Sequence, residues 1–285
     1  MIYDSVIIGT GPAGLSAALT LKIRGKNFIW IGSRNMSDKV CKAECISNYP
    51  GFINISGAEL NETFRSQTEA MEIEIAEKMV NSIMPFSDHY AVMAGSEFYE
   101  SRTVIFATGI ANAATLPGET DYVGRGVSYC ATCDGNLYRG KTVAVICNNV
   151  RFEHEVKYLS EIAGKVYYFP LYKNVSVSAD NIEIQTEKAV GIVGDGKRVS
   201  GVKLRDGSTA DVNGVFCLRD SVALSALMPQ LRTEDGHISV DRSMSTNIKG
   251  IFAAGDCTGR PYQYAKAIGE GNVAAHSVLE FLSQE

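Results

Sequence analysis

The sequence lacks the features that mark membrane, secreted and nucleic-acid-binding proteins. No apolar stretch reaches the roughly 18 residues that a membrane-spanning helix requires. Val6-Ile7-Ile8 leads directly into a glycine loop, without the basic leader of a signal peptide. The formal net charge of −5 argues against a surface for nucleic acid. These absences predict a cytoplasmic protein that binds neither nucleic acid nor a membrane.

The cysteines fit neither a disulfide scaffold nor a zinc site. Seven is an odd number, which suits a stapled secreted protein poorly at a length of 285 residues. Cys130 and Cys133 form the one Cys-x-x-Cys pair, and the four histidines lie far apart in the sequence. We therefore expect no metal, and we expect this pair to be catalytic in a reducing compartment.

Two stretches of the sequence have the pattern of strand, loop and helix. The first has an apolar strand over 3–8, a glycine loop, and a helix over 13–24. The second has a strand over 142–146, a loop over 147–152, and a helix that ends at Gly164. With 45% hydrophobic residues and 27 glycines, the chain is predicted to be an α/β protein with two domains of related architecture.

The end of the chain is expected to return to the first domain. A helix-like stretch over 57–77 belongs to that domain, and a late buried strand over 250–256 ends in a Gly-Asp pair. We expect a discontinuous first domain of residues 1–112 and 242–285, and a second domain of residues 113–241.

The first loop has the spacing of a dinucleotide site. Gly9 permits a tight turn, Gly11 lets the backbone approach a pyrophosphate, and Gly14 allows close packing of helix and strand. The acidic residue usually found after the second strand is missing, because Gly32, Ser33 and Arg34 occupy that place. Ser33 or backbone groups are expected to hold the ribose instead, with Arg34 near the adenosine end.

Five motifs together resemble those of the low-molecular-weight thioredoxin reductases. They lie at both ends and in the middle of the chain, and the six-residue cysteine motif is the most specific of them: Gly9-Thr10-Gly11-Pro12-Ala13-Gly14, Asn48-Tyr49-Pro50-Gly51, Ala107-Thr108-Gly109, Cys130-Ala131-Thr132-Cys133-Asp134-Gly135 and Gly250-Ile251-Phe252-Ala253-Ala254-Gly255-Asp256. The resemblance implies a thioredoxin reductase-like fold of two Rossmann-like, three-layer ββα domains, with a discontinuous FAD domain.

The resemblance also implies a bound FAD. Asp256 would lie near the ribityl chain and pyrophosphate, Asn48 beside the isoalloxazine, and Tyr264-Ala265 along its pyrimidine edge. The residues expected to bind FAD are Gly9, Gly11, Pro12, Ala13, Gly14, Ser33, Arg34, Asn48, Thr108, Gly109, Gly255, Asp256, Tyr264 and Ala265.

The same resemblance implies roles for the cysteine motif. Cys133 would exchange electrons with FAD, Cys130 would form the mixed disulfide with thioredoxin, and Asp134 would protonate the departing thiolate. The chemistry agrees, since one thiol of a Cys-x-x-Cys pair often has a lowered pKa. A partly desolvated carboxylate beside it is able to act as an acid near neutrality. The alternative role for Asp134 is a helix N-cap, which is compatible with the first.

The second loop departs from the family's NADPH-binding pattern. Its three small positions fall on Cys147, Asn149 and Phe152. Asn149 puts a side chain where a pyrophosphate would meet bare backbone, and Phe152 puts a ring where only Gly or Ala lets the helix pack closely. Pro170-Leu171-Tyr172 stands where a basic cluster would hold a 2′-phosphate. We therefore expect no NADPH.

This pattern resembles that of the ferredoxin-dependent flavin thioredoxin reductases, which keep FAD and the cysteine pair but do not use nicotinamide. The resemblance implies a homodimeric enzyme that passes electrons from reduced ferredoxin through FAD and the cysteine pair to thioredoxin. The alternatives are an NADPH-dependent reductase with an atypical loop, a related flavoprotein disulfide reductase with another partner, and a redox sensor. Intact Cys130, Cys133 and Asp134 argue against the sensor.

Two further groups of residues in the first domain are of interest. Cys41 and Cys45 precede Asn48, and they are either a second redox pair or buried structural thiols. Because ferredoxins are generally acidic, docking requires a positive patch, for which the candidates are Lys22, Arg24, Lys26, Arg34, Lys39 and Lys42.

Overall fold

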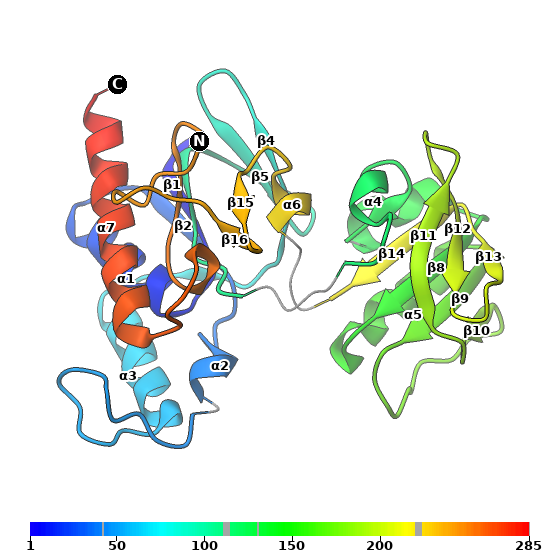
Figure 1. Cartoon of the computed structure of the whole chain (residues 1–285), viewed down its shortest axis with the longest axis horizontal. Coiled ribbons are helices and arrows are strands. Elements are labelled where there is room, and N and C mark those ends of the chain that lie inside the picture. Colours follow the sequence, from blue (N-terminus) through cyan, green and yellow to red (C-terminus); the bar gives the residue numbers. More distant parts are fainter. Residues whose placement is uncertain (42, 111–114, 130, 220–223, 285) are drawn as a thin grey trace. The chain divides into compact units, whose positions relative to one another are not determined.

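The chain folds as two α/β units, the first of which is discontinuous. The computed structural model describes residues 1–41, 43–110, 115–129, 131–219 and 224–284. Unit 1 is Met1–Ala111 with Met228–Glu285, and unit 2 is Asn112–Leu227. In Figure 1, unit 1 accordingly combines blue and cyan segments with orange and red ones, while unit 2 runs from green to yellow.

The chain returns to unit 1 earlier than the sequence pattern predicted, at Met228 rather than residue 242. β15 (Thr233–Glu234) and β16 (His237–Ile238) form an antiparallel hairpin in the returning segment. The His237 ring is hydrogen-bonded through Nε2 to the Tyr262 hydroxyl at 2.7 Å, which ties the hairpin to unit 1. Nothing in the sequence of so short a hairpin indicates which domain it packs against.

Unit 1 is built on a seven-stranded sheet of β1 (Tyr3–Ile8), β2 (Phe28–Ile31), β3 (Ile75–Ala76), β4 (Val80–Pro85), β5 (Tyr90–Ala94), β6 (Glu97–Phe106) and β17 (Ile251–Ala253). The order is β3-β2-β1-β6-β5-β4, and β17 also pairs with β6. The β1, β2, β3, β6 and β17 pairings are parallel, whereas β5 is antiparallel to both β6 and β4. Val6, Ile7 and Val104 are completely buried, as expected of parallel strands that are covered on both faces.

Two helices from opposite ends of the sequence, α1 (Pro12–Ile23) and α7 (Tyr264–Ser283), lie side by side in unit 1 (Figure 1). The contact is close because Gly271 of α7 has no side chain: a Cβ there would lie 2.1 Å from the Ala13 carbonyl oxygen. This packing brings the beginning of α7 to the glycine loop.

The helix predicted over 57–77 is shorter in the structure, where α2 (Asp38–Cys41) precedes α3 (Gly57–Ala70). α3 begins with a capping box, in which Ser56 Oγ accepts from the Glu59 N–H and the Glu59 carboxylate accepts from the Ser56 N–H. Glu72 adopts a left-handed φ of +52°, and the next residues join the sheet as β3. Pairing with β2 therefore decides the conformation of this last stretch.

Unit 2 contains a five-stranded parallel sheet of β7 (Val127–Ser128), β8 (Thr142–Cys147), β9 (Lys165–Pro170), β10 (Ile182–Ile184) and β14 (Gly214–Leu218), in the order β10-β9-β8-β14-β7. β11 (Ala189–Gly194), β12 (Val199–Leu204) and β13 (Thr209–Asp211) form a separate antiparallel sheet. α5 (Glu153–Ile162) buries Val156 and Leu159 in a core shared with Val143 and Val145 of β8.

The prediction of an α/β protein with two Rossmann-like domains is confirmed.

The remaining short helices are α4 (Ala131–Asp134), α6 (Leu224–Leu227) and the 3₁₀ turns η1 (Thr120–Tyr122), η2 (Gly135–Tyr138), η3 (Val150–Phe152) and η4 (Asp256–Thr258). Within the described part of the chain, every helix is too short or too polar to span a bilayer.

Candidate active site

The glycine loop of unit 1 is a cradle that side chains would fill. A Cβ on Gly14 would lie 1.9 Å from the Gly9 carbonyl oxygen, and one on Gly9, whose φ is +107°, would lie 2.3 Å from the Ala107 carbonyl oxygen. A Cβ on Gly11 would face open space, because no heavy atom lies within 4 Å of the position that it would take. The Trp30 indole donates a 2.8 Å hydrogen bond to the Gly9 carbonyl and so fixes the loop against β2.

The N-terminus of α1 presents free donors to an anion. Gly11 is the N-cap and Pro12 begins the helix, and neither a capping side chain nor an acidic residue in the first turn meets its N–H groups. Such a terminus stabilises a pyrophosphate through the N–H groups and the helix dipole. The open space at Gly11 and the uncapped helix therefore fit the FAD implied by the sequence motifs.

The segments expected to bind FAD follow the carboxyl ends of parallel strands. Gly9 follows β1, Thr108 follows β6, and Gly255 follows β17 after one further residue. Because these strands are parallel neighbours, their carboxyl ends lie at one edge of the sheet, where ligands of open α/β sheets bind. Gly109 and Gly255 adopt φ values of +64° and +88°, which turn the chain away from the strand ends.

Ser33 and Arg34 lie directly after β2, and both are exposed. The Ser33 N–H donates to Thr10 Oγ1 at 3.1 Å, which holds this turn beside the glycine loop. Ser33 Oγ accepts from the Asn35 N–H at 3.1 Å, while Arg34 lies 4.0 Å from the Glu77 carboxylate. The roles of Ser33 and Arg34 at the ribose and adenosine end stay a prediction, and the Arg34 side chain also interacts with Glu77.

Asn48, Asp256 and Tyr264 meet at the start of α7. Asn48 Nδ2 donates a 2.7 Å hydrogen bond to Oε1 of Gln263, the N-cap residue of α7. The pKa of Tyr264 is raised by burial and by the negative charge of Asp256. The structure therefore joins three distant segments, with Ala265 next along the helix.

Lys266 and Glu270 are residues that the sequence reading missed. Lys266 Nζ donates to the carbonyl oxygens of Gly255 (2.8 Å) and Gly259 (2.7 Å), and it lies 3.1 Å from the Glu270 carboxylate. Glu270 in turn accepts from the Gly255 N–H at 2.8 Å and from the Thr258 hydroxyl at 2.9 Å. This half-buried pair holds the turn that carries Asp256. Its only sequence signal is an i,i+4 Lys-Glu spacing, which is common on helices.

The corresponding loop of unit 2 is closed by its own side chains. Asn149 adopts an extended conformation, and its side chain accepts the Arg151 N–H at 3.1 Å, capping η3. Cys147 is completely buried and lies 3.2 Å from the Asn149 carbonyl oxygen, to which its thiol donates. Phe152 is also buried and is covered by the Arg151 guanidinium at 4.8 Å. The interactions of a pyrophosphate at this helix are replaced by protein groups.

A buried carboxylate, Glu153, occupies the beginning of α5. It accepts from the Tyr172 hydroxyl at 2.7 Å and from the Ser176 N–H at 3.0 Å, and the Ser176 hydroxyl also donates to it. Burial raises the pKa of Glu153, but the hydrogen bonds from Ser176 and Tyr172 outweigh it and lower the pKa overall. The first turn of α5, where a nucleotide phosphate would bind, thus carries a negative charge. Tyr172 comes from the segment that would hold the basic cluster of an NADPH site.

The cysteine motif is only partly described. Cys130 and the side chain of Cys133 lie outside the described residues. Asp134 is the last residue of α4, is partly buried, and precedes η2. Its side chain forms no capping hydrogen bond with η2, so the N-cap alternative for Asp134 receives no support.

The sequence also did not predict a buried ion pair of Glu119, which lies shortly before the cysteine motif, with the distant Arg219. Arg219 and Glu119 form two hydrogen bonds of 2.7 and 2.9 Å, and their side chains are 5% and 0% exposed. The same carboxylate accepts from the Leu116 N–H at 2.9 Å and from the Tyr129 hydroxyl at 3.0 Å. Tyr129 directly precedes Cys130, so this cluster anchors the segment that enters the motif.

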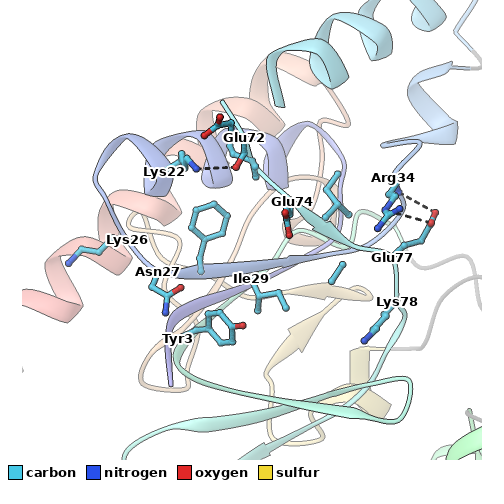
Figure 2. Close-up of a pocket in the computed structure, with 14 residues that line it drawn as sticks. Tyr3, Lys22, Lys26, Asn27, Ile29, Arg34, Glu72, Glu74, Glu77 and Lys78 are labelled. Carbon is cyan, nitrogen blue, oxygen red and sulfur yellow. Dashed lines mark hydrogen bonds and ion pairs between the residues drawn. The ribbon is translucent and has the colours of Figure 1, made fainter. Parts of the chain in front are cut away.

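The positive patch predicted for ferredoxin is mixed in charge. Lys22, Lys26 and Arg34 line a cleft of about 640 Å³ together with Glu72, Glu74 and Glu77. Figure 2 shows Lys22 directed at Glu72, to whose carbonyl it donates at 3.0 Å, and Arg34 directed at Glu77. Arg24 is exposed, whereas Lys42 and the side chain of Lys39 lie outside the described residues. The described lysines and arginines therefore do not form a uniformly basic surface.

Cys41 and Cys45 are exposed free thiols. The expectation that they are buried structural thiols is wrong, because the segment between α2 and Asn48 runs over the surface of unit 1. Nor does the structure pair them as a disulfide.

Comparison with known proteins defines the class first. The sequence model of the family described as pyridine nucleotide-disulphide oxidoreductase matches residues 3–147 and 174–271, which is most of the chain. The thioredoxin reductase of Listeria monocytogenes is 32% identical, with 99% of this chain and 95% of that protein aligned. The chain belongs to the thioredoxin reductase family of these oxidoreductases.

Comparison with solved structures reaches higher sequence identities than comparison with the curated sequences. A ferredoxin-flavin thioredoxin reductase from Clostridium acetobutylicum is 46% identical with a TM-score of 0.86, over 99% of each chain. A second structure of that name from the same organism is 44% identical with a TM-score of 0.88, over 100% of this chain and 98% of the other. A thioredoxin reductase structure from Gloeobacter violaceus is 27% identical with a TM-score of 0.77, over 99% and 94%.

Proposed function

We propose that this protein uses FAD and the Cys130–Cys133 pair to reduce thioredoxin, with electrons from reduced ferredoxin instead of NADPH. The observation that carries the choice of donor is the second loop, where Asn149, Phe152 and Glu153 replace the groups that would bind a nucleotide pyrophosphate. The names of the similar Clostridium structures support the same donor.

When bound, FAD supplies a carrier that takes up electrons singly and releases them in pairs. In unit 1 the glycine loop and the uncapped end of α1 would hold its pyrophosphate, and the Lys266–Glu270 pair holds the turn of Asp256. Asn48 and Tyr264, which both lie at the start of α7, would border the ring system.

The thiol chemistry belongs to unit 2. In the reduced pair, the Cys130 thiolate attacks the thioredoxin disulfide, and a mixed disulfide forms as one thioredoxin thiolate leaves. Cys133 then attacks Cys130 Sγ, which releases the second thioredoxin thiolate and closes the Cys130–Cys133 disulfide. Asp134 provides a proton to a leaving thiolate. Two electrons thus pass from the pair to thioredoxin.

Anaerobic mixing tests the donor. The oxidised holoprotein is mixed separately with NADPH and with chemically reduced ferredoxin, and the flavin absorbance is followed. We expect bleaching by ferredoxin within seconds, and no bleaching by stoichiometric NADPH over the same period. Rapid bleaching by NADPH would overturn the proposal. A steady-state assay with oxidised thioredoxin distinguishes an enzyme from a redox sensor.

The proposal includes a homodimer located in the cytoplasm. The resemblance implies the dimer, and the odd number of cysteines suits a reducing compartment. Light scattering after gel filtration measures the mass and contradicts the dimer if it gives that of one 30.8 kDa chain.

A further inference from the structure

Both residues that flank Cys130 are bonded to carboxylates in unit 2. The Tyr129 hydroxyl donates to Glu119, and the Ala131 N–H donates to Glu155 Oε2 at 3.3 Å. The two carboxylates differ in whether a basic side chain neutralises their charge. Glu119 is neutralised by Arg219 through two hydrogen bonds, whereas no lysine or arginine within the described ranges forms an ion pair with Glu155.

Glu155 is built into the support of the cysteine motif. It lies in the first turn of α5 and is partly buried, and α4 and η2 both pack against this helix. The packing is close, because a Cβ on Gly135 would lie 3.2 Å from side-chain atoms of both Tyr158 and Leu159. Ala131 itself is completely buried. The position of Glu155 relative to the Ala131 amide is therefore fixed by the fold.

The charge of Glu155 acts on a buried thiol nearby, that of Cys147. Burial raises the pKa of Glu155, against the effect of the Ala131 N–H and of His154. Burial also raises the pKa of the Cys147 thiol, and the negative charges of Glu153 and Glu155 raise it further. The described titratable groups on α5 and on the elements packed against it are Asp134 of α4, Tyr138 of η2, Arg151 of η3, Lys165, Tyr167 and Tyr168 of β9, and Glu153, His154, Lys157, Tyr158 and Glu161 of α5. Cys147 of β8 lies in the same core as Val156 of α5.

We infer that Glu155 is a positioning residue that tunes the Cys130–Cys133 pair, keeping it strongly reducing by disfavouring the thiolate. This inference rests on the proposed function. Reduction of the pair breaks the S–S bond, takes up two electrons delivered through FAD, and yields one thiolate and one thiol whose proton comes from solvent. A carboxylate beside the motif opposes the new negative charge, and it also occupies an amide donor adjacent in sequence to Cys130. Both effects make the pair a better donor to thioredoxin.

The substitution Glu155→Gln tests the inference, because glutamine keeps the shape and the hydrogen-bond acceptor but removes the charge. In the holoprotein equilibrated with dithiol redox buffers at a pH above the pKa of the thiol that ionises, we expect the disulfide to be about tenfold easier to reduce, a shift of about 30 mV to less negative potential. The pH profile of alkylation of the reduced protein is expected to move down by about one unit.

The pH dependence distinguishes tuning from a structural effect. Because the pKa of Glu155 is raised, its charge and its influence are present above that pKa and are lost as the pH falls through it. The potentials of wild type and Glu155→Gln should therefore converge at acidic pH. Glu155→Asp should restore part of the shift, and Glu161→Gln, at an exposed position of the same helix, should leave both readouts unchanged.

Coincident potentials and alkylation profiles in wild type and Glu155→Gln would overturn the inference alone. If Cys130 and Cys133 do not interconvert between disulfide and dithiol in the wild type, the proposed function fails as well. Flavin content and thermal unfolding of each variant separate these outcomes from misfolding.

Discussion

The two strand-loop-helix units of this chain differ in what meets the N-terminus of the helix. In unit 1, α1 begins without a capping side chain and without an acidic residue in its first turn. In unit 2, Asn149 caps η3, and α5 begins with Glu153 and Glu155. The strands β1 and β8 are nevertheless both buried along most of their length. The strand and helix of a Rossmann unit are therefore kept when side chains supply the interactions that a phosphate would make at the helix N-terminus.

The largest effect that we predict breaks the unit 1 loop. Gly14→Ala places a methyl group 1.9 Å from a backbone carbonyl oxygen, and the backbone has to move to relieve the overlap. We expect purified protein almost without flavin and a loss of stability of about 3 kcal/mol or more. The flavin-to-protein absorbance ratio and urea unfolding measure these changes.

Gly11→Ala is the matched control for Gly14→Ala. Its methyl group faces open space and its φ of −76° suits alanine, so the apoprotein should unfold at the wild-type urea concentration. FAD affinity should still fall, because the backbone no longer meets the pyrophosphate closely. Normal flavin content in Gly14→Ala would show that the cradle is not needed.

A smaller effect concerns the buried carboxylate of Glu153 at the beginning of α5. Glu153→Leu leaves the Tyr172 hydroxyl and the Ser176 N–H without their acceptor, and we expect a loss of about 1–3 kcal/mol in the free energy of unfolding. Tyr172→Phe leaves the bonds from Ser176 in place but removes the Tyr172 hydroxyl as partner of the buried Tyr168 hydroxyl, and it should cost about 1–2 kcal/mol. Urea unfolding gives both values.

The same variant sharpens the comparison of the loops. NADPH should still not bleach the flavin of the Glu153→Leu variant, since Asn149 and Phe152 remain. Bleaching by NADPH after this single change would mean that one charge, and not the whole loop, excludes the nucleotide.

The smallest effect that we predict concerns the second half of the unit 1 site. Lys266→Met removes the donors to the Gly255 and Gly259 carbonyl oxygens, while Glu270 keeps its bonds to the Gly255 N–H and Thr258. FAD affinity should fall about tenfold, equivalent to about 1.4 kcal/mol. Titration of the apoprotein with FAD measures it, with the partly exposed Lys26→Met as the control. An unchanged affinity would mean that the turn of Asp256 is held without the lysine.

The sequence predicted the parts of the site that depend on local pattern. The glycine loop, the strands beside it and the altered loop at Cys147 to Phe152 were all found because glycine spacing and apolar runs act within a few residues. It did not predict the Lys266–Glu270 clamp, since an i,i+4 pair on a helix does not show which turn it contacts. The mixed charge around Lys22 and Arg34 was also unforeseen, because Glu72 and Glu77 approach them through the pairing of β3 with β2.

By itself, the sequence determined the α/β class, the thioredoxin reductase family, the intact first loop and the altered second loop. These follow from side-chain size and backbone freedom at particular positions, and they hold wherever the units pack. Only the tertiary structure decided that Glu153 binds Tyr172 and Ser176, that Glu119 meets Arg219, and that Glu155 reaches the Ala131 amide. Each of these contacts joins segments that the sheet of unit 2 brings together. Folding therefore decides which buried carboxylates are neutralised by a basic side chain, as Glu119 is by Arg219, and which stay negatively charged beside thiols.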